Sequence, residues 1–276
     1  MYFEKEIITS RNNSFVKWAA SLGEKKNRKE NGYFLAEGIK LTKEAFEAGL
    51  PIDFCILSES KKNTVLKSIC DFENNPLYEK TKIVTVSEGV FEKISTEKAP
   101  QGVISIIKHL DFFRDMDIIY KEEFFLKPEE KAIFLFSVRD PSNLGSVIRS
   151  CVAFGIDHII LSDDCADIYS PKTVRSAMGS LYRVKVTTVK DVSSFIEAAQ
   201  CNSRRVFAAE LSERAVSLSD LNLCGNDIVM IGNEGHGIDA DISALCDGSV
   251  YIPISKKTES LNASVAAAIF MWEQSK

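Results

Sequence analysis

The sequence predicts an α/β protein in which a smaller N-terminal α/β sandwich domain precedes a mostly parallel sheet in the C-terminal half. Short apolar runs of strand length alternate with segments of helix length along most of the 276 residues. Strands that alternate with helices pair in parallel, and the helices cover both faces of the sheet. A chain of this length is sufficient for one large domain or two ordinary ones, each with its own core.

The alternation is interrupted once, over residues 109–131, where mixed charges accompany several large apolar side chains. This interruption predicts a first domain over 1–108, a linker over 109–131 and a second domain over 132–276. The linker is too apolar to be a free tether. We therefore expect it to pack on one or both domains, and a helix is one conformation that it can take.

The first domain is expected to begin with a helix over 13–23, because an Asn-Ser pair starts this segment and a glycine ends it. A basic segment from Lys25 to Lys29 follows, and we predict a loop there, which is either a solvated turn or an RNA contact. The remaining pattern predicts strands over 33–36, 54–57, 83–86 and 102–107, and helices over 39–48, 63–72 and 90–94.

The second domain shows the same alternation. It predicts strands over 132–138, 158–162, 182–189, 206–211, 227–231 and 250–254, and helices over 144–155, 192–199, 238–245 and 263–272, with a further helical turn from Pro171. In the helix over 144–155, Leu144, Val147 and Ile148 lie on one buried face. Gly145 and Arg149 lie four residues apart on the opposite face, which we expect to be open.

The last predicted helix, 263–272, is almost wholly apolar, and this composition predicts burial on nearly every side. The chain enters the helix through Ser260, Leu261 and Asn262. Serine and asparagine at this place either cap the helix or form one wall of a binding site. The segment alone leaves both possibilities open.

Polar loops follow the predicted strands after residues 138, 231 and 254, and parallel sheets bind ligands at the carboxyl ends of their strands. The loop over 232–237 has the spacing G-x-x-G-x-G, which is not that of the dinucleotide fingerprint. Its glycines allow either a tight turn or the close approach of a ligand to the backbone. Glu234 is able to accept hydrogen bonds from backbone N–H groups in this turn, so a structural role is as plausible as a catalytic one.

Charge and cysteine content exclude several classes of protein. The formal net charge of −5 argues against a general polyanion binder, but residues 1–108 hold 17 Lys or Arg against 15 Asp or Glu, which makes the first domain the better RNA contact. The seven cysteines are scattered and there are only three histidines, so we expect neither a disulfide framework nor a metal site. No apolar run is long enough to cross a bilayer and the start is no signal peptide, which predicts a cytoplasmic protein.

Three ordered segments of the second domain resemble the motifs of the SpoU/TrmH branch of the SPOUT RNA methyltransferases. They run from Asp140 to Arg149, from Ile231 to Gly237 and from Ile252 to Ala266. The segment 170–179 matches the usual sequence between the first two motifs. Residues 8–17 and 34–38 are similar, more loosely, to the ribosomal-protein-like substrate-binding domain found in many members.

The resemblance implies a trefoil knot in the second domain, against the general rule that chains avoid knots. It also implies a homodimer with an active site shared between subunits, and S-adenosylmethionine as the cofactor. By motif position the cofactor-binding residues are Ile231, Gly232, Gly235, Ile252, Ile254 and Leu261, and the catalytic residues are Asn143, Arg149, Glu234, Ser260 and Asn262. The expected RNA contacts of the first domain are Arg11, Lys17, Lys25, Lys26, Arg28 and Lys29.

The implied activity is transfer of a methyl group from S-adenosylmethionine to a ribose 2′-hydroxyl of structured RNA, with ribosomal RNA favoured by the extra N-terminal domain. Because a guanidinium stays protonated and is a poor base, we expect Arg149 to hold a phosphate and stabilise the developing alkoxide. Alternatives are a tRNA 2′-O-methyltransferase and a non-catalytic RNA-binding protein of the same fold. A nucleotide-dependent oxidoreductase fits the glycine spacing less well.

Overall fold

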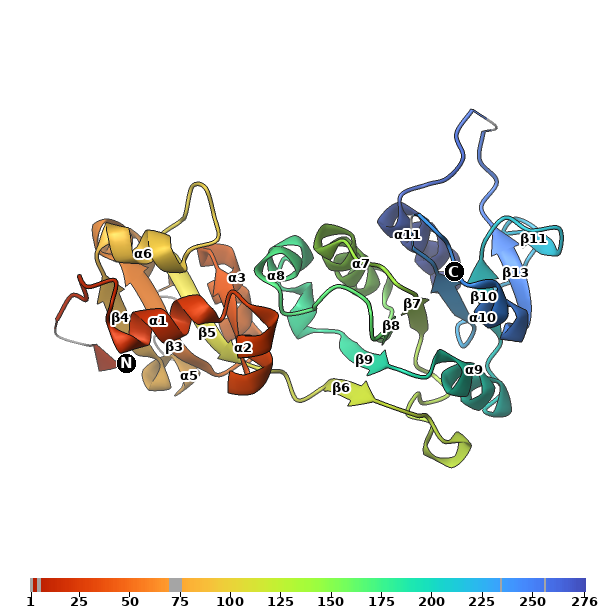
Figure 1. Cartoon of the computed structure of the whole chain (residues 1–276), viewed down its shortest axis with the longest axis horizontal. Coiled ribbons are helices and arrows are strands. Elements are labelled where there is room, and N and C mark those ends of the chain that lie inside the picture. The colour runs from red at the N-terminus through yellow and green to blue at the C-terminus, as the bar shows by residue number, and fades with distance from the viewer. Residues whose placement is uncertain (1, 4–5, 70–75, 234, 256) are drawn as a thin grey trace. The chain divides into compact units, whose positions relative to one another are not determined.

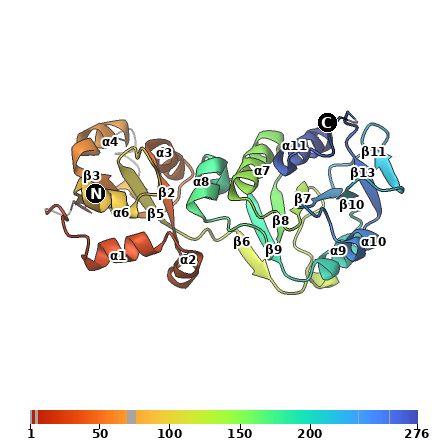
Figure 2. The same ribbon diagram turned by 45° about the horizontal axis from the view of Figure 1, so that its top comes forward.

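A computed structural model describes residues 2–3, 6–69, 76–233, 235–255 and 257–276. By their internal contacts the residues fall into two compact units (Figures 1 and 2). Unit 1 comprises Met1–Leu110 together with Asp167–Arg183, and unit 2 comprises Asp111–Ala166 together with Val184–Lys276. The segment 167–183, which separates two strands of unit 2 in the sequence, therefore packs with the N-terminal residues.

Unit 1 contains a five-stranded sheet in the order β1-β4-β3-β5-β2. β5 runs antiparallel to β2 and β3, and the other recorded pairings are parallel. The strands are β1 (Tyr2–Phe3), β2 (Tyr33–Glu37), β3 (Ile52–Ser58), β4 (Lys82–Val86) and β5 (Val103–Lys108). The helices are α1 (Ser14–Ser21), α2 (Lys25–Asn31), α3 (Ile39–Glu47), α4 (Lys62–Ile69), α5 (Pro76–Lys80), α6 (Glu88–Ile94) and α8 (Pro171–Ala177), with 3₁₀ turns η1 (Glu59–Lys61) and η4 (Ser180–Tyr182).

Local chemistry explains where the first helices begin and end. Asn13 caps α1, since its side chain accepts hydrogen bonds from the backbone N–H groups of Phe15 and Val16. The predicted basic loop is wrong, because residues 25–31 form helix α2. This helix ends at Gly32, which takes the left-handed conformation that suits glycine at a helix end.

Unit 2 contains an eight-stranded sheet in the order β11-β13-β10-β12-β7-β8-β9-β6, and its recorded pairings are all parallel. The α/β class and the mostly parallel sheet are thus confirmed. The strands are β6 (Phe113–Met116), β7 (Ala132–Leu135), β8 (His158–Ser162), β9 (Lys185–Val189), β10 (Val206–Ala209), β11 (Ala215–Ser217), β12 (Ile228–Ile231) and β13 (Gly248–Tyr251). The helices are α7 (Pro141–Phe154), α9 (Val192–Cys201), α10 (Ala240–Leu245) and α11 (Ala263–Ser275), and the 3₁₀ turn η3 spans Lys121–Glu123.

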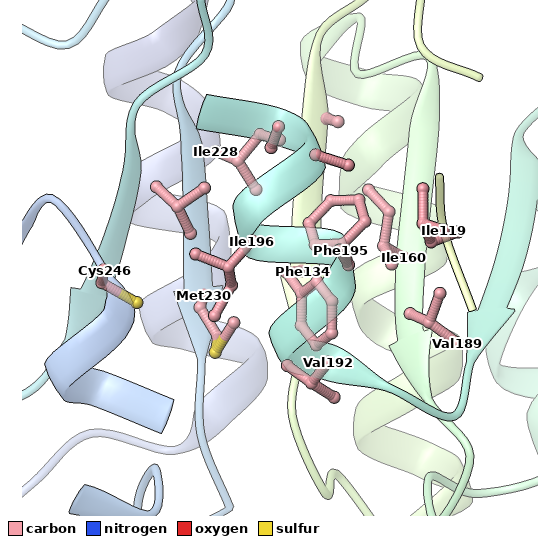
Figure 3. Packing of buried hydrophobic residues seen from close by; sticks show 14 of the residues in the cluster. Ile119, Phe134, Ile160, Val189, Val192, Phe195, Ile196, Ile228, Met230 and Cys246 are labelled. Carbon is pink, nitrogen blue, oxygen red and sulfur yellow. The ribbon is translucent and has the colours of Figure 1, made fainter. Parts of the chain in front are cut away.

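Helices cover both faces of this sheet, as the sequence predicts. α7 and α11 lie together on one face, and α9 and α10 lie on the other (Figure 2). Between α9 and the strands lies a buried cluster in which Phe195 packs against Phe134, with ring centroids 5.2 Å apart, and beside Ile160 and Met230 (Figure 3). Strands β7, β8 and β12 are buried along their whole length. This burial on both faces explains why their sequences are mostly apolar and do not alternate between apolar and polar residues.

Within the segment 109–131, residues 109 and 110 belong to unit 1 and residues 111–131 belong to unit 2, where they form a strand and a 3₁₀ turn rather than an α-helix. Its strand β6 pairs with the sheet edge at β9. Ile119 and Leu126 are buried in the same cluster as Phe195, and Phe124 and Phe125 pack against it. Phe124 and Phe125 of this segment therefore pack on the core of unit 2, whereas Tyr120 is exposed.

Helix α11 is less buried than its composition predicts. Phe270 and Met271 are buried, but Val265 and Trp272 are 47% and 54% exposed. These two residues are seven apart and lie on one face of the helix. Among the described residues, every helix is too short or too polar to span a bilayer.

Candidate functional site

A pocket of about 250 Å³ lies at the carboxyl ends of β10, β12 and β13 in unit 2. Five of the six predicted cofactor-binding residues line it, namely Ile231, Gly232, Ile252, Ile254 and Leu261. Ser260, predicted to be catalytic, lines the same pocket. Strand ends that are 20 or more residues apart in the sequence thus meet around one cavity, at the position where parallel sheets bind ligands.

The glycine-rich loop forms one wall of the pocket and is closed on itself. The backbone groups of Asn233 and Gly237 exchange two hydrogen bonds of 3.0 and 2.9 Å. A Cβ atom at Gly232 would lie 2.4 Å from the carbonyl carbon of Gly237, so only glycine allows this approach. The first glycine therefore serves the tight turn, and the turn presents its backbone to the pocket.

Asn233 holds the shape of this loop, a role that the sequence led us to consider for Glu234. Its side-chain oxygen accepts hydrogen bonds from the N–H groups of Gly235 (2.7 Å) and His236 (3.3 Å), and its amide donates to the carbonyl of Ser137 (2.8 Å). Glu234 lies outside the described residues. Gly235 is exposed and is not among the residues that line the pocket.

At the entry to α11, one residue caps the helix and another lines the pocket. Asn262 is the cap, because its Oδ1 accepts from the N–H groups of Ser264 (2.9 Å) and Val265 (3.4 Å). Its amide nitrogen also donates to Oδ1 of Asn143, at 3.0 Å. The first and third motifs are thus joined by a direct hydrogen bond, while Ser260 faces the pocket.

Helix α7 carries the first motif and starts earlier than the hydrophobic pattern indicates. Asp140 caps it by accepting from the N–H groups of Ser142 (2.8 Å) and Asn143 (2.9 Å), with proline in the first turn. Arg149 is exposed, as expected, but Gly145 is buried, so the expectation of an open face at Gly145 is wrong. Arg149 is not among the residues that line the pocket.

The sequence prediction missed the contribution of Glu210 and Leu211, which follow Ala209 at the end of β10 and line the pocket with it. Oε1 of Glu210 accepts hydrogen bonds from the hydroxyls of Ser243 (2.8 Å) and Ser249 (2.6 Å). Burial acts to raise the pKa of this carboxyl group, but the hydroxyl donors, Ser249 before Ser243, outweigh it and lower the pKa below its ordinary value. Glu210 is therefore an ionised wall of the pocket at neutral pH.

The basic residues predicted to contact RNA are divided by burial. Arg11, Lys17, Lys25, Lys26 and Lys29 are exposed on unit 1.

Arg28 is 3% exposed and belongs to the interior of unit 1, so it is the exception in this set. Its Nε and Nη2 atoms lie 3.2 and 2.5 Å from Oδ2 of Asp167, and Nη1 donates to the carbonyls of Leu22 and Gly23. Its predicted place in the RNA contact is wrong because the guanidinium is occupied inside the unit.

Metal ligands do not cluster in the part of the chain that the structure describes: no group of three or more His, Cys, Asp or Glu side chains is arranged to hold an ion. Cys55, Cys151, Cys165, Cys201, Cys224 and Cys246 are free thiols, and Cys70 lies outside the described residues.

Comparisons with known proteins match this architecture. A protein of Bacillus subtilis, named 23S rRNA (guanosine(2553)-2′-O)-methyltransferase RlmP, is 27% identical over 269 residues that cover 97% of this chain and 98% of the relative. A Streptomyces viridochromogenes protein, named 23S rRNA (uridine(2479)-2′-O)-methyltransferase, is 28% identical over 96% of this chain and 90% of its own. A crystal structure titled as an AdoMet-bound rRNA methyltransferase from Sinorhizobium meliloti has 26% identity and a TM-score of 0.79, covering 98% of this chain and 97% of that one.

Two family models divide the chain between them. Residues 13–105 match the MRM3-like substrate binding domain. Residues 130–272, slightly more than half of the chain, match the SpoU rRNA Methylase family, and they include the pocket, its glycine-rich loop and the Asn143–Asn262 contact. This protein belongs to the SpoU rRNA methylase family.

Proposed function

We propose that this protein transfers a methyl group from S-adenosylmethionine to a ribose 2′-hydroxyl of ribosomal RNA. The observation that carries the proposal is the pocket, because its walls come from the second and third motifs of the family. The two named relatives both modify a 2′-oxygen of 23S rRNA, but at different bases and positions. The proposal therefore extends to the ribosomal RNA and the ribose oxygen, and not to a particular base.

The pocket is chemically suited to S-adenosylmethionine. Ile231, Leu261, Ala266 and Phe270 provide apolar walls for a flat purine. The closed turn at Gly232 brings backbone polar groups to the same wall, and Glu210 adds a hydrogen-bond acceptor for ligand hydroxyl or amino groups. When bound, this cofactor would supply a methyl group on a sulfonium centre: transfer to the ribose oxygen breaks the carbon–sulfur bond, leaves S-adenosylhomocysteine and releases the hydroxyl proton to water.

The residues of the motifs have complementary tasks in this proposal. Arg149, exposed on α7, holds a phosphate of the RNA and stabilises negative charge as it develops on the ribose oxygen. The Asn143–Asn262 hydrogen bond fixes the first turn of α7 against the entry to α11, so it sets where Arg149 projects. Ser260 lines the pocket and supplies a hydroxyl group from the third motif.

The domain organisation belongs to the same proposal. Residues 1–108 bind the RNA, 109–131 link the parts and 132–276 carry out catalysis. The match of 13–105 to a substrate-binding domain and the exposed lysines of α1 and α2 support this assignment. An enzyme that acts on ribosomal RNA in this way would work in the cytoplasm.

We further propose that unit 2 contains the trefoil knot and forms a homodimer. α11 packs against α7 and against β12, in the middle of the sheet, which is the placement that a threaded C-terminal segment needs. On the outer side of α11, Val265 and Trp272 remain exposed, and Trp272 meets Phe154 of α7 with ring centroids 5.9 Å apart. An apolar face of this kind suits a second copy of the chain.

The test uses ribosomal RNA from cells that lack the protein. Wild-type protein is expected to transfer tritium from labelled S-adenosylmethionine to this RNA, and to protect one phosphodiester bond from alkaline cleavage because the neighbouring 2′-oxygen is methylated. Arg149→Ala should bind the cofactor with unchanged affinity in calorimetry and lose turnover by at least ~100-fold.

Arg183→Ala serves as the control, because this arginine is half exposed and forms only a loose ion pair in unit 1. Cofactor binding without any transfer to RNA by the wild type would instead favour the non-catalytic RNA-binding alternative. Equal turnover of Arg149→Ala and wild type would remove Arg149 from the mechanism.

A further inference from the structure

Glu210 is the charged side chain of the pocket that lies outside the three family motifs. It follows directly after β10, and its backbone N–H donates to the carbonyl of Val250 in β13 (3.1 Å), which fixes the backbone next to the pocket. We infer that the Glu210 carboxylate binds the vicinal hydroxyls of the cofactor ribose, and this inference rests on the proposed use of S-adenosylmethionine.

The carboxylate is held by one of its two oxygens. Oε1 receives the hydroxyls of Ser243 and Ser249 at 2.8 and 2.6 Å, and Nη2 of Arg214 lies 3.9 Å away. Arg214 is itself anchored to the same two serines, with Nε donating to Ser249 Oγ (3.1 Å) and Nη2 to Ser243 Oγ (2.7 Å). These contacts fix the orientation of the group and leave acceptor capacity on Oε2.

Such an arrangement selects among the donors that the cofactor offers. An ionised carboxylate accepts hydrogen bonds and donates none, so it must face a ligand hydroxyl or amino group. Its charge is already partly balanced by Arg214 and two hydroxyl dipoles, which favours neutral hydroxyl donors over a second cation. A single carboxylate at a strand end is also the arrangement by which other parallel-sheet proteins hold a ribose.

Few other side chains of the pocket are placed to accept hydrogen bonds from the ribose hydroxyls. Among the residues that line the pocket, Asn233 is occupied by its own loop, and Glu259 and Ser260 are exposed. Glu210 is half-buried, with 22% of its side chain exposed. A hydrogen bond formed there is shielded from water more than one formed at the exposed rim.

The experiment compares the effect of one substitution in the protein on the binding of ligands with and without the ribose hydroxyls. Wild type, Glu210→Gln and the control Glu213→Gln, which makes the same change at an exposed position of the same loop, are titrated calorimetrically. The ligands are 5′-methylthioadenosine, its 2′,3′-dideoxy analogue and S-adenosylhomocysteine. Thermal unfolding of the ligand-free proteins checks that each variant is folded, and Glu210→Asp, which keeps the charge, replaces Glu210→Gln if the latter is not.

Glu210→Gln is expected to weaken binding of 5′-methylthioadenosine by about 10- to 100-fold, the range for losing hydrogen bonds to a charged group. The dideoxy analogue should bind the variant and the wild type within about twofold, because the hydroxyls that the carboxylate would hold are absent, and Glu213→Gln should match wild type throughout.

An equal loss for both nucleosides, or no loss for either, would overturn the inference. A loss confined to S-adenosylhomocysteine would also overturn it, since the carboxylate would then face the amino group of the amino-acid part. Failure of the wild type to bind any of the three ligands would count against the proposed function itself.

Discussion

Removal of Asp167 should destabilise unit 1 far more than its place in a surface loop would indicate. Arg28 is buried, with 4% of its side chain exposed, and Asp167 Oδ2 lies 3.2 and 2.5 Å from its Nε and Nη2 atoms. Asp167→Ala removes the opposite charge and leaves the guanidinium in the interior. Loss of one partner of a buried pair costs about 3–5 kcal/mol, because the remaining charge is then desolvated without compensation.

Urea unfolding measures this cost when it is followed by the fluorescence of Trp18, which lies in unit 1, in a Trp272→Phe background. Glu47→Ala is the matched control, because Glu47 and Arg183 form an ion pair of 3.9 Å with both side chains about half exposed. That exposed pair should contribute about 0–1 kcal/mol. If Asp167→Ala costs no more stability than Glu47→Ala, the Arg28–Asp167 pair does not stabilise unit 1 in the way that its burial indicates.

Three further predictions concern the pocket, the sheet and the RNA contact. Gly232→Ala should weaken cofactor binding by at least ~10-fold in calorimetry, because the added carbon collides with the backbone of the loop, while Gly89→Ala, with open space around the added carbon, should not. Burial lowers the pKa of His158 from 6.5 to about 4, so its contribution to stability is complete above pH ~6.5 and is lost as the pH falls toward 4. Between pH 7 and pH 5 the free energy of unfolding should therefore fall by about 2 kcal/mol less in His158→Gln than in the wild type, as measured by urea unfolding at the two pH values. Glutamate substitutions at the exposed lysines of α2, Lys25, Lys26 and Lys29, should lower the affinity for ribosomal RNA. They should also reduce the slope of log affinity against log salt concentration by about 0.7–0.9 for each lost phosphate contact. An unchanged slope would mean that these lysines face only solvent.

Hydrophobic periodicity predicted the elements that bury an apolar face and failed where other forces decide. The central strands β7, β8 and β12 and helix α7 were all predicted, because their burial is encoded in their own residues. α2 was not, since it carries no apolar side chain and its buried residue is Arg28. β6 and β11 were also missed, because they are short edge strands whose burial patterns show no apolar face and whose pairing depends on a neighbour.

In the candidate site, too, the sequence predicted residues that belong to local motifs and missed a residue whose contacts are distant in the sequence. The motif residues Ile231, Gly232 and Leu261 were expected together, and all three line the pocket. Glu210 was missed because its importance arises from Ser243 and Ser249, which are 33 and 39 residues away in the sequence. The exposed face of α11 was missed for a related reason, as composition gives the polarity of a helix but not the number of neighbours that cover it.

The interruption of unit 2 by residues 167–183 means that unit 1 is not encoded by one continuous stretch of the sequence. Unit 1 is completed by a segment whose neighbours in sequence belong to β8 and β9 of the other unit. Tyr169 of this segment stacks on Phe34, with ring centroids 4.8 Å apart, and accepts a hydrogen bond from the N–H of Leu110 (2.7 Å). A recombination event that replaced only the N-terminal residues would leave these partners mismatched, so an exchange of unit 1 would have to carry the segment 167–183 with it.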